Sequence, residues 1–342
     1  MSAPSNPLAQ LLWLTLIALA GLYAASLRAE PAHVLRISTE NTAEHVQTRA
    51  IERFARELEQ ASDGQIDVDF NHSARLFRDR DVIAALTTGK VEMAVPGMWQ
   101  LDRYVPDVGL YMLPLFYGRS AQENYRVRDG EVGASISAGI GQDLGLKVLG
   151  RWLDLGHAHL YFTDQPVQRH EALAGRRIRI PGGIANRSRL QAFGADPVIV
   201  AWPDLPDALG NGQVTGVLTT HETVRSAGLW RNGVRFSFED RQYFAQYVPL
   251  VNADFWARLP DELKRLMQTT WDRVVDDQRA EAAQAQAEAK AALLAEGIQI
   301  DTADAPALKH WRTVARQHED DMISRMGVDP ELVRRAEAVL EH

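Results

Sequence analysis

Residues 173–183 read L-A-G-R-R-I-R-I-P-G-G, and this stretch decides how we interpret the fold. After a turn signal, Arg177 and Arg179 alternate with Ile178 and Ile180 before a Pro-Gly-Gly sequence ends the run. Because side chains alternate faces along a β-strand, the two isoleucines share one face and the two arginines the other. The arginine face belongs either to a solvated edge strand or to a ligand site at the strand's carboxyl end, where open α/β sheets bind ligands.

Arg179 lies where this predicted strand stops and the backbone turns away. A guanidinium group can hold a carboxylate through two parallel charge-assisted hydrogen bonds, which a lysine ammonium cannot do. Arg179 is therefore our candidate anchor for a carboxylate ligand.

Two other stretches share one helix–glycine–strand pattern. Residues 81–95 read D-V-I-A-A-L-T-T-G-K-V-E-M-A-V, and residues 204–218 read D-L-P-D-A-L-G-N-G-Q-V-T-G-V-L. Aligned without a gap, they match at an aspartate, an alanine, a leucine, a glycine and a valine. This internal repeat predicts two similar α/β domains, and two such domains facing each other would form a cleft.

The rest of the chain fits this organisation. The patterns of residues 33–39, 44–62 and 65–70 predict a strand, a helix and a second strand. Residues 261–296 are almost uninterrupted helix formers, rich in alanine. Because their apolar residues keep no heptad register, we expect one long amphipathic helix on a globular body rather than a coiled coil.

Composition excludes several classes of function. A chain of 342 residues with 46% hydrophobic residues can bury a large core and favours two domains. The net charge of −8, without a long basic segment, argues against a nucleic-acid partner. The chain has no cysteine, which excludes disulfides, thiolate metal sites and cysteine nucleophiles.

The N-terminal residues predict export. Residues 8–25 are almost wholly apolar and are followed by small residues typical of a signal cleavage site. We therefore expect residues 1–29 to be a signal peptide. An uncleaved membrane anchor is the alternative, because no lysine or arginine precedes the apolar run.

We find no sequence motif for a nucleotide, metal or catalytic site. Nucleotide-binding, metalloprotease, nucleophile-elbow and calcium-loop spacings are all absent from the sequence. His157 and His159 would share one face of a strand, but two imidazoles without a third nearby ligand make a weak metal site. We therefore expect a binding protein without metal or cofactor, and not an enzyme.

The order of several segments resembles the solute-binding proteins of TRAP (tripartite ATP-independent periplasmic) transporters, of the DctP type. The resemblance begins with the exported leader and the helix that opens after His45. It continues through A-L-T-T-G-K-V-E-M-A at 85–94, L-P-L-F at 113–116, G-L-K-V-L-G at 145–150, L-A-G-R-R-I-R-I-P at 173–181 and the segment 208–216.

This resemblance implies an α/β fold of the periplasmic-binding-protein type, a two-lobed clamshell with a long helix spanning both lobes. Lobe I would comprise residues 33–154 and about 245–275, and lobe II residues 155–244 and about 276–342. The protein would capture a small organic acid in the periplasm and deliver it to the membrane permease subunits of a TRAP transporter. A periplasmic ligand sensor or scaffold with the same clamshell is the alternative.

The resemblance also implies ligand-binding residues. The carboxylate-binding arginine of the family falls on Arg179. Where many relatives carry a second arginine this chain has G-H-A-H, so His159 is expected to take its place, with a neutral structural histidine as the alternative. Thr219 occupies the position of a common asparagine contact, and these departures leave the identity of the acid open. The predicted ligand set is completed by Glu40, Asn41, Trp99 and Trp202.

Overall fold

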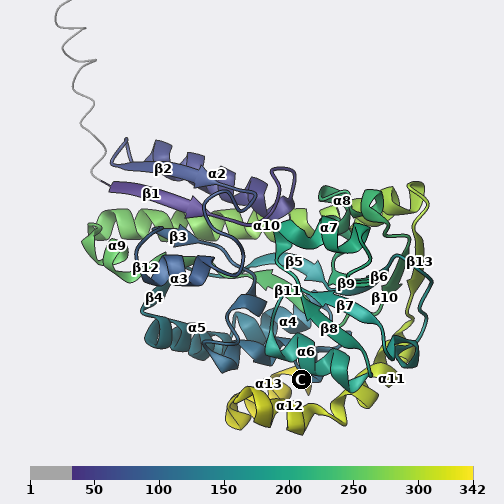
Figure 1. Cartoon of the computed structure of the whole chain (residues 1–342). Coiled ribbons are helices and arrows are strands. Elements are labelled where there is room, and N and C mark those ends of the chain that lie inside the picture. The colour runs from purple at the N-terminus through teal and green to yellow at the C-terminus, as the bar shows by residue number, and fades with distance from the viewer. Residues whose placement is uncertain (1–32, 342) are drawn as a thin grey trace, which may run out of the picture.

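The structure is a computed structural model that describes residues 33–341, so the predicted signal peptide lies outside the described residues. Two β-sheets form two lobes, and a long helix runs along both of them (Figure 1). No helix within residues 33–341 is long and apolar enough to cross a membrane.

The first sheet, which defines lobe I, has five strands in the order β2-β1-β3-β12-β4. Strands β2 and β3 are parallel to β1, whereas β12 is antiparallel to both β3 and β4. The bounds are β1 His33–Ser38, β2 Ile66–Asn71, β3 Met93–Ala94, β4 Leu146–Val148 and β12 Leu250–Asn252.

The second sheet, which defines lobe II, repeats this order as β8-β7-β9-β6-β10 and adds β13 at the edge. Strands β8 and β9 are parallel to β7, and β6 is antiparallel to β9 and β10. The bounds are β6 His159–Phe162, β7 Arg177–Ile180, β8 Asp196–Ile199, β9 Gly216–Thr219, β10 Phe236–Glu239 and β13 Gln299–Thr302.

The predicted β-α-β opening is confirmed. Helix α2 (Val46–Ala61) joins β1 to β2 and buries the apolar stripe expected from its spacing. Ile51, Phe54 and Leu58 of this stripe are fully buried in the core of lobe I.

The predicted helix–glycine–strand repeat is also confirmed. Helix α3 (Val82–Thr87) precedes β3 in lobe I, and helix α7 (Leu205–Gly210) precedes β9 in lobe II. Gly89 and Gly212 follow the two helices with φ of +69° and +72°, a left-handed conformation that glycine adopts without steric cost. The two repeats thus place equivalent strands next to β1 and next to β7.

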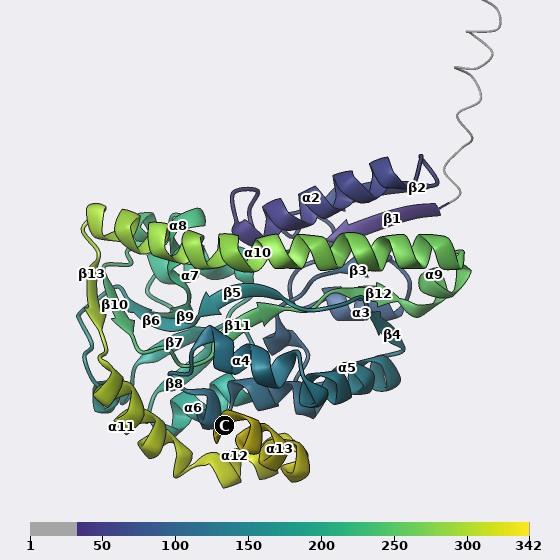
Figure 2. The same cartoon turned by 180° about the vertical axis from the view of Figure 1, so that it is seen from behind.

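Two crossing strands and one long helix join the lobes. Strands β5 (Leu153–His157) and β11 (Phe244–Tyr247) pair antiparallel between the two sheets. Helix α10 (Asp261–Ala295) contacts α2 in lobe I, β5 at the crossing and α8 (His221–Ser226) in lobe II, and Figure 2 shows it along the whole width of the molecule. The prediction of a single long helix is confirmed, and its 35 residues span roughly 50 Å.

The remaining helices cover the sheets. The C-terminal helices contact helices of lobe I as well as helices of lobe II. Helix α13 contacts α4 and α5, whereas α12 contacts α6 of lobe II. The division at 154/155, 244/245 and about 275 stays a prediction. The bounds are α4 Ala121–Arg128, α5 Glu131–Leu144, α6 Ile184–Ala192, α9 Ala253–Arg258, α11 Ala305–Arg316, α12 Glu319–Met326 and α13 Pro330–Glu341.

Candidate functional site between the lobes

Strand β7 carries the two arginines that the sequence singled out. It lies between β8 and β9, so the interpretation as a solvated edge strand is wrong. Arg177, near the start of the strand, is exposed, whereas Arg179, near its end, is only 2% exposed. The two arginines thus differ in exposure because of their position along the strand and not because they lie on different faces.

Arg179 is held in place but keeps part of its guanidinium group free. Its Nε donates a hydrogen bond to the carbonyl oxygen of Val200 at 3.0 Å, and its Cζ lies 5.8 Å from the ring centroid of Trp202. Within residues 33–341 the two terminal nitrogens have no hydrogen-bond partner. Burial lowers the pKa of Arg179, against the opposing effect of the Asp79 and Glu40 carboxylates. The fork is therefore fixed at one end and available at the other.

Arg179 lines a cavity between the two lobes. About 390 Å³ of this cavity is not occupied by protein atoms, but the centres of water molecules can occupy only about 30 Å³ of it. A ligand held there would therefore be small, and it would contact groups from both lobes. Six of the seven predicted ligand residues line this cavity, namely Glu40, Asn41, Trp99, Arg179, Trp202 and Thr219.

Lobe I supplies two carboxyl groups on the opposite side from Arg179. Burial raises the pKa of Glu40 to about 8, with a further contribution from the charge of Asp79, and Arg179 opposes both. Burial also raises the pKa of Asp79, against the charge of Arg179 and a hydrogen bond from the Trp202 amide at 3.1 Å. Because its pKa is near 8, Glu40 is largely protonated at neutral pH and can donate a hydrogen bond.

Sequence reasoning missed two tyrosines and one aspartate of this site. Tyr243 and Tyr247 line the cavity, and the Asn41 amide donates to the Tyr247 hydroxyl at 2.8 Å. Burial raises the pKa of Tyr243 to about 12, so its hydroxyl stays neutral. Tyr247 ends strand β11, and Asp79 lies in a loop without a recognisable sequence pattern.

The structure does not bring His159 to Arg179, which corrects our expectation. Ala158 lines the cavity between the lobes, whereas His157 and His159 on either side of it line a different cavity. The alternation correctly placed both histidines on one face, but that face turns away from the lobe interface. His159 is therefore not part of the candidate acid site.

A carboxylate from lobe I caps a helix of lobe II. Helix α6 begins after Gly183, which has no side chain to accept a hydrogen bond. Asp102 instead accepts from the amides of Ile184 and Ala185 at 2.7 and 3.3 Å. Burial raises the pKa of Asp102 to about 6, against these amide hydrogen bonds. The bonds require the lobes to be close together.

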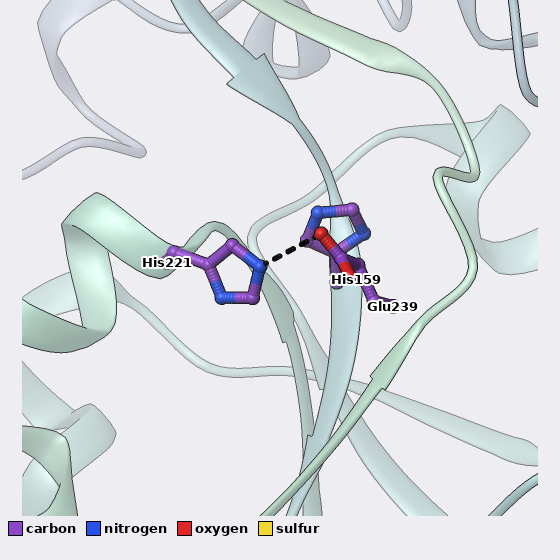
Figure 3. A group of neighbouring side chains, drawn as sticks. All are labelled: His159, His221 and Glu239. Carbon is purple, nitrogen blue, oxygen red and sulfur yellow. Dashed lines mark hydrogen bonds and ion pairs between the residues drawn. The ribbon is translucent and has the colours of Figure 1, made fainter. Parts of the chain in front are cut away.

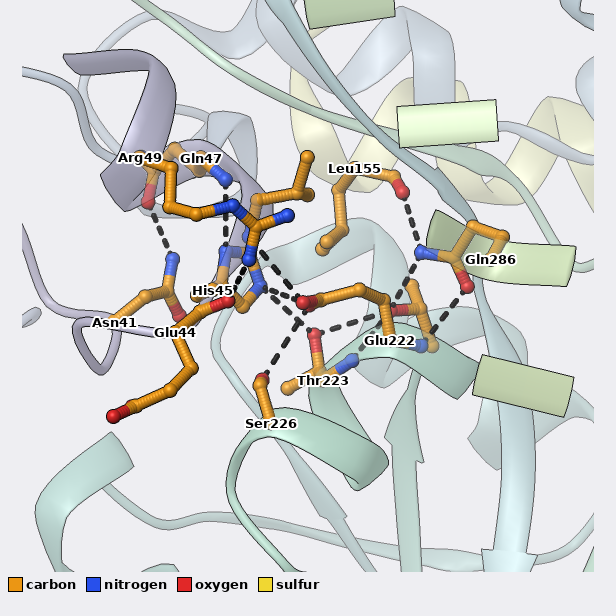
Figure 4. Close-up of polar contacts among 12 residues, drawn as sticks. Asn41, Glu44, His45, Gln47, Arg49, Leu155, Glu222, Thr223, Ser226 and Gln286 are labelled. Atoms are coloured by element: carbon orange, nitrogen blue, oxygen red, sulfur yellow. Dashed lines mark hydrogen bonds and ion pairs between the residues drawn. The ribbon is translucent and has the colours of Figure 1, made fainter. Parts of the chain in front are cut away.

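A carboxylate from lobe II meets the start of a helix in lobe I, as Figure 4 shows. His45 caps α2 because its Nδ1 accepts from the Gln47 amide at 3.2 Å, which leaves the ring proton on Nε2. That Nε2 lies 3.0 Å from Glu222 Oε2, and the other oxygen accepts from the Val46 amide at 3.3 Å. Burial would raise the pKa of Glu222, but His45 and the Val46 amide outweigh it and the pKa is lowered.

Together these contacts define a class of protein: two similar α/β lobes that meet over a small cavity, with a partly free arginine fork inside it. Domains of this kind bind ligands in the crevice and close by hinge motion.

The comparison with known proteins agrees. The profile of the family described as "Bacterial extracellular solute-binding protein, family 7", abbreviated DctP, matches residues 37–325. The chain belongs to this family. The resemblance predicted from the sequence is confirmed, and with it the expectation of a solute-binding protein rather than an enzyme.

Individual relatives are distant. A "Solute-binding protein" of Chromohalobacter salexigens is 22% identical over 256 residues, 75% of each chain. The "C4-dicarboxylate-binding periplasmic protein DctP" of Rhodobacter capsulatus is 22% identical over 279 residues, 81% of this chain and 82% of that one. A TRAP periplasmic solute-binding protein of Sulfurospirillum deleyianum, solved with bound succinate, has a TM-score of 0.83 at 20% identity, covering 90% of this chain and 99% of that one. This last likeness confirms the two-lobed fold.

Proposed function

We propose that this protein captures a small organic carboxylate between its lobes, with Arg179 as the anchor. The observation that carries the proposal is the buried guanidinium group whose terminal nitrogens have no partner within the described residues. Buried guanidinium nitrogens that lack hydrogen-bond partners are costly, and a bound carboxylate would satisfy the two terminal nitrogens with charge-assisted hydrogen bonds. The C4-dicarboxylate and succinate in the names of two relatives support this ligand class.

The other residues of the cavity have complementary roles in this proposal. Protonated Glu40 donates a hydrogen bond to the ligand from lobe I, and Asn41 and Thr219 supply further polar contacts. Trp99 and Trp202 cover the apolar part of the ligand and exclude water, which strengthens the charged contact. Ligand contacts from both lobes would favour the closed form over the open one.

The extracytoplasmic family and the predicted signal peptide support a location in the periplasm. We infer that the protein delivers its acid there to the membrane permease subunits of a TRAP transporter. The likeness in fold to the TRAP periplasmic solute-binding protein of Sulfurospirillum deleyianum supports the permease as the partner.

The test is a thermal-shift screen of small mono- and dicarboxylates, followed by calorimetry with the acid that stabilises the protein most. Replacing Arg179 with Lys keeps the charge but removes one arm of the fork, so affinity should fall by about 1.5–3 kcal/mol. Arg177→Lys is the matched control, because Arg177 lies on the same strand but is exposed. Equal affinities of the two variants would exclude Arg179 as the anchor.

A further inference from the structure

A second cavity lies behind the crossing strands, on the side of α10. The centres of water molecules can occupy about 280 Å³ of it, far more than in the cavity between the lobes. Ala282, Ala283 and Ala287 of α10 form one wall. The alanine-rich part of the long helix therefore leaves room where larger side chains would fill the space.

Arg241 is a charged residue of this cavity whose guanidinium group forms no ion pair among the described residues. Its amide donates to His159 Nδ1 at 3.1 Å, and its carbonyl accepts from the Gly118 amide at 2.9 Å. Within residues 33–341 its guanidinium group has no hydrogen-bond or ion-pair partner, although it lines the cavity. The backbone at Arg241 is left-handed, with φ of +49°, a strained conformation for arginine that is often retained at functional sites.

The amide of Arg241 also fixes the tautomer of His159. Because Nδ1 accepts a hydrogen bond from a backbone amide, the proton of the neutral ring must lie on Nε2. Burial, reinforced by the nearby charge of His221, holds the pKa of His159 well below its usual range. His159 therefore presents a neutral N–H donor in the cavity that Arg241 also lines.

The carboxylates around the cavity are already paired. Glu239 accepts from Lys290 Nζ at 2.5 Å and from Thr302 Oγ1 at 2.5 Å, and it lies 3.3 Å from His221 Nε2. Asp154 on the opposite wall accepts from the Tyr125 hydroxyl. These carboxylates are thus less able to repel an anion that approaches Arg241.

A metal ion is the competing occupant, because ligand atoms of His159, His221 and Glu239 all lie within 4.8 Å of one another (Figure 3). Two features disfavour it. A metal on His159 Nε2 would force a proton onto Nδ1, where the Arg241 amide already donates. The ammonium group of Lys290 also occupies one oxygen of Glu239.

We propose that this second cavity binds a small oxyanion, with the guanidinium group of Arg241 as its anchor and the Nε2–H of His159 as a second donor. The site is distinct from the acid site at Arg179. Gln286 of α10 lines the second cavity and donates to the carbonyl of Leu155 at 2.6 Å, and Leu155 lines the first cavity. The two cavities therefore share a wall.

The experiment uses the full mature chain carrying Arg179→Lys, so that the first site is weakened, and titrates it separately with acetate, inorganic phosphate and Zn²⁺. We expect saturable binding of one equivalent of acetate or phosphate, with a shift of the His159 Nε2–H resonance in protein labelled with 15N-histidine. The stronger of the two anions identifies carboxylate or phosphate as the natural chemistry.

Adding Arg241→Gly should weaken this binding at least tenfold without unfolding the protein, because glycine suits the left-handed backbone. Adding Arg177→Gln instead should leave it unchanged, since Arg177 is exposed on β7. Absence of an anion site, an anion site that survives Arg241→Gly, or a Zn²⁺ site lost only in His221→Ala would each overturn the proposal. The His159 resonance reports on the second cavity alone, so its response to Arg241→Gly is independent of whether Arg179 anchors the transported acid.

Discussion

The two lobes have the same strand order but opposite chemistry at equivalent positions. Ser38 of β1 pairs with Ala94, and Arg179 of β7 pairs with Val217, at matching places in the two repeats. Lobe I therefore has a small hydroxyl where lobe II has a cation, and it contributes carboxyl groups from the loops instead. One duplicated framework can thus form an asymmetric site without a change of topology.

Each lobe also provides a carboxylate that contacts the start of a helix in the other lobe, and the two helices occupy equivalent positions. Helix α2 joins β1 to β2 and α6 joins β7 to β8, and each begins at a carboxylate from the other lobe. Glu222 faces a histidine and has a lowered pKa, whereas Asp102 is hydrogen-bonded by backbone amides and burial raises its pKa. We therefore expect Glu222, which contacts the imidazole ring of His45, to stabilise the folded protein more than Asp102 does.

The largest expected effect is a difference in the free energy of unfolding between variants of Glu222 and Asp102. Glu222→Ala removes the carboxylate that His45 and the Val46 amide contact and leaves His45 Nε2 only the Thr223 hydroxyl at 3.3 Å; losing one partner of a buried pair costs about 3–5 kcal/mol. Asp102→Ala removes a cap whose own burial is unfavourable, so it should cost only about 0.5–2 kcal/mol. Urea unfolding of both variants measures the difference. An equal or larger loss for Asp102→Ala would refute the distinction.

A second change copies the residue of lobe I into lobe II. Arg179→Ser removes the cation from the cavity and should weaken carboxylate binding by about 2–5 kcal/mol. Ser38→Ala alters the equivalent position of lobe I, where the buried hydroxyl has no partner within the described residues, and should change affinity by less than about 0.5 kcal/mol. Calorimetry compares the two. If both variants bind equally weakly, the lobes do not differ in the way proposed here.

The smallest effect concerns the carboxyl group of lobe I. A bound anion raises the pKa of Glu40 further above about 8, so the complex keeps this proton to higher pH than the free protein. Affinity should be constant below that pH and fall as pH rises through it, by at most about tenfold per unit. Dissociation constants between about pH 6 and pH 9 test this for the wild type. Glu40→Gln cannot ionise, so a wild-type slope that persists in this variant would rule out Glu40 as its source.

Local patterns predicted the parts of the fold and site that depend on neighbouring residues. The alternation around Arg179, the helical stripe of α2 and the repeated helix–glycine–strand units all reappear in the structure. Periodicity also placed His157 and His159 on one face, but it cannot tell which face meets the other lobe. That choice depends on how β5 crosses between the sheets.

The partners that come from distant segments had no local signal. Asp79, Tyr243 and Glu222 acquire their roles only when the two lobes meet, because each faces a residue far away in the sequence. Their pKa values also depend on burial that a sequence does not display. The resemblance to a family supplied the clamshell, but not these contacts.

Strand β12 has a further consequence for how the chain acquires its structure. It lies between β3 and β4 in lobe I, yet residues 250–252 follow the whole of β6 to β10 in the sequence. The sheet of lobe I thus remains split until most of lobe II has been synthesised, and such non-local pairing is slow to form. Lobe I is therefore the part of the chain whose sheet can be completed only after residues 250–252 have been added, although its first strand is the first element described.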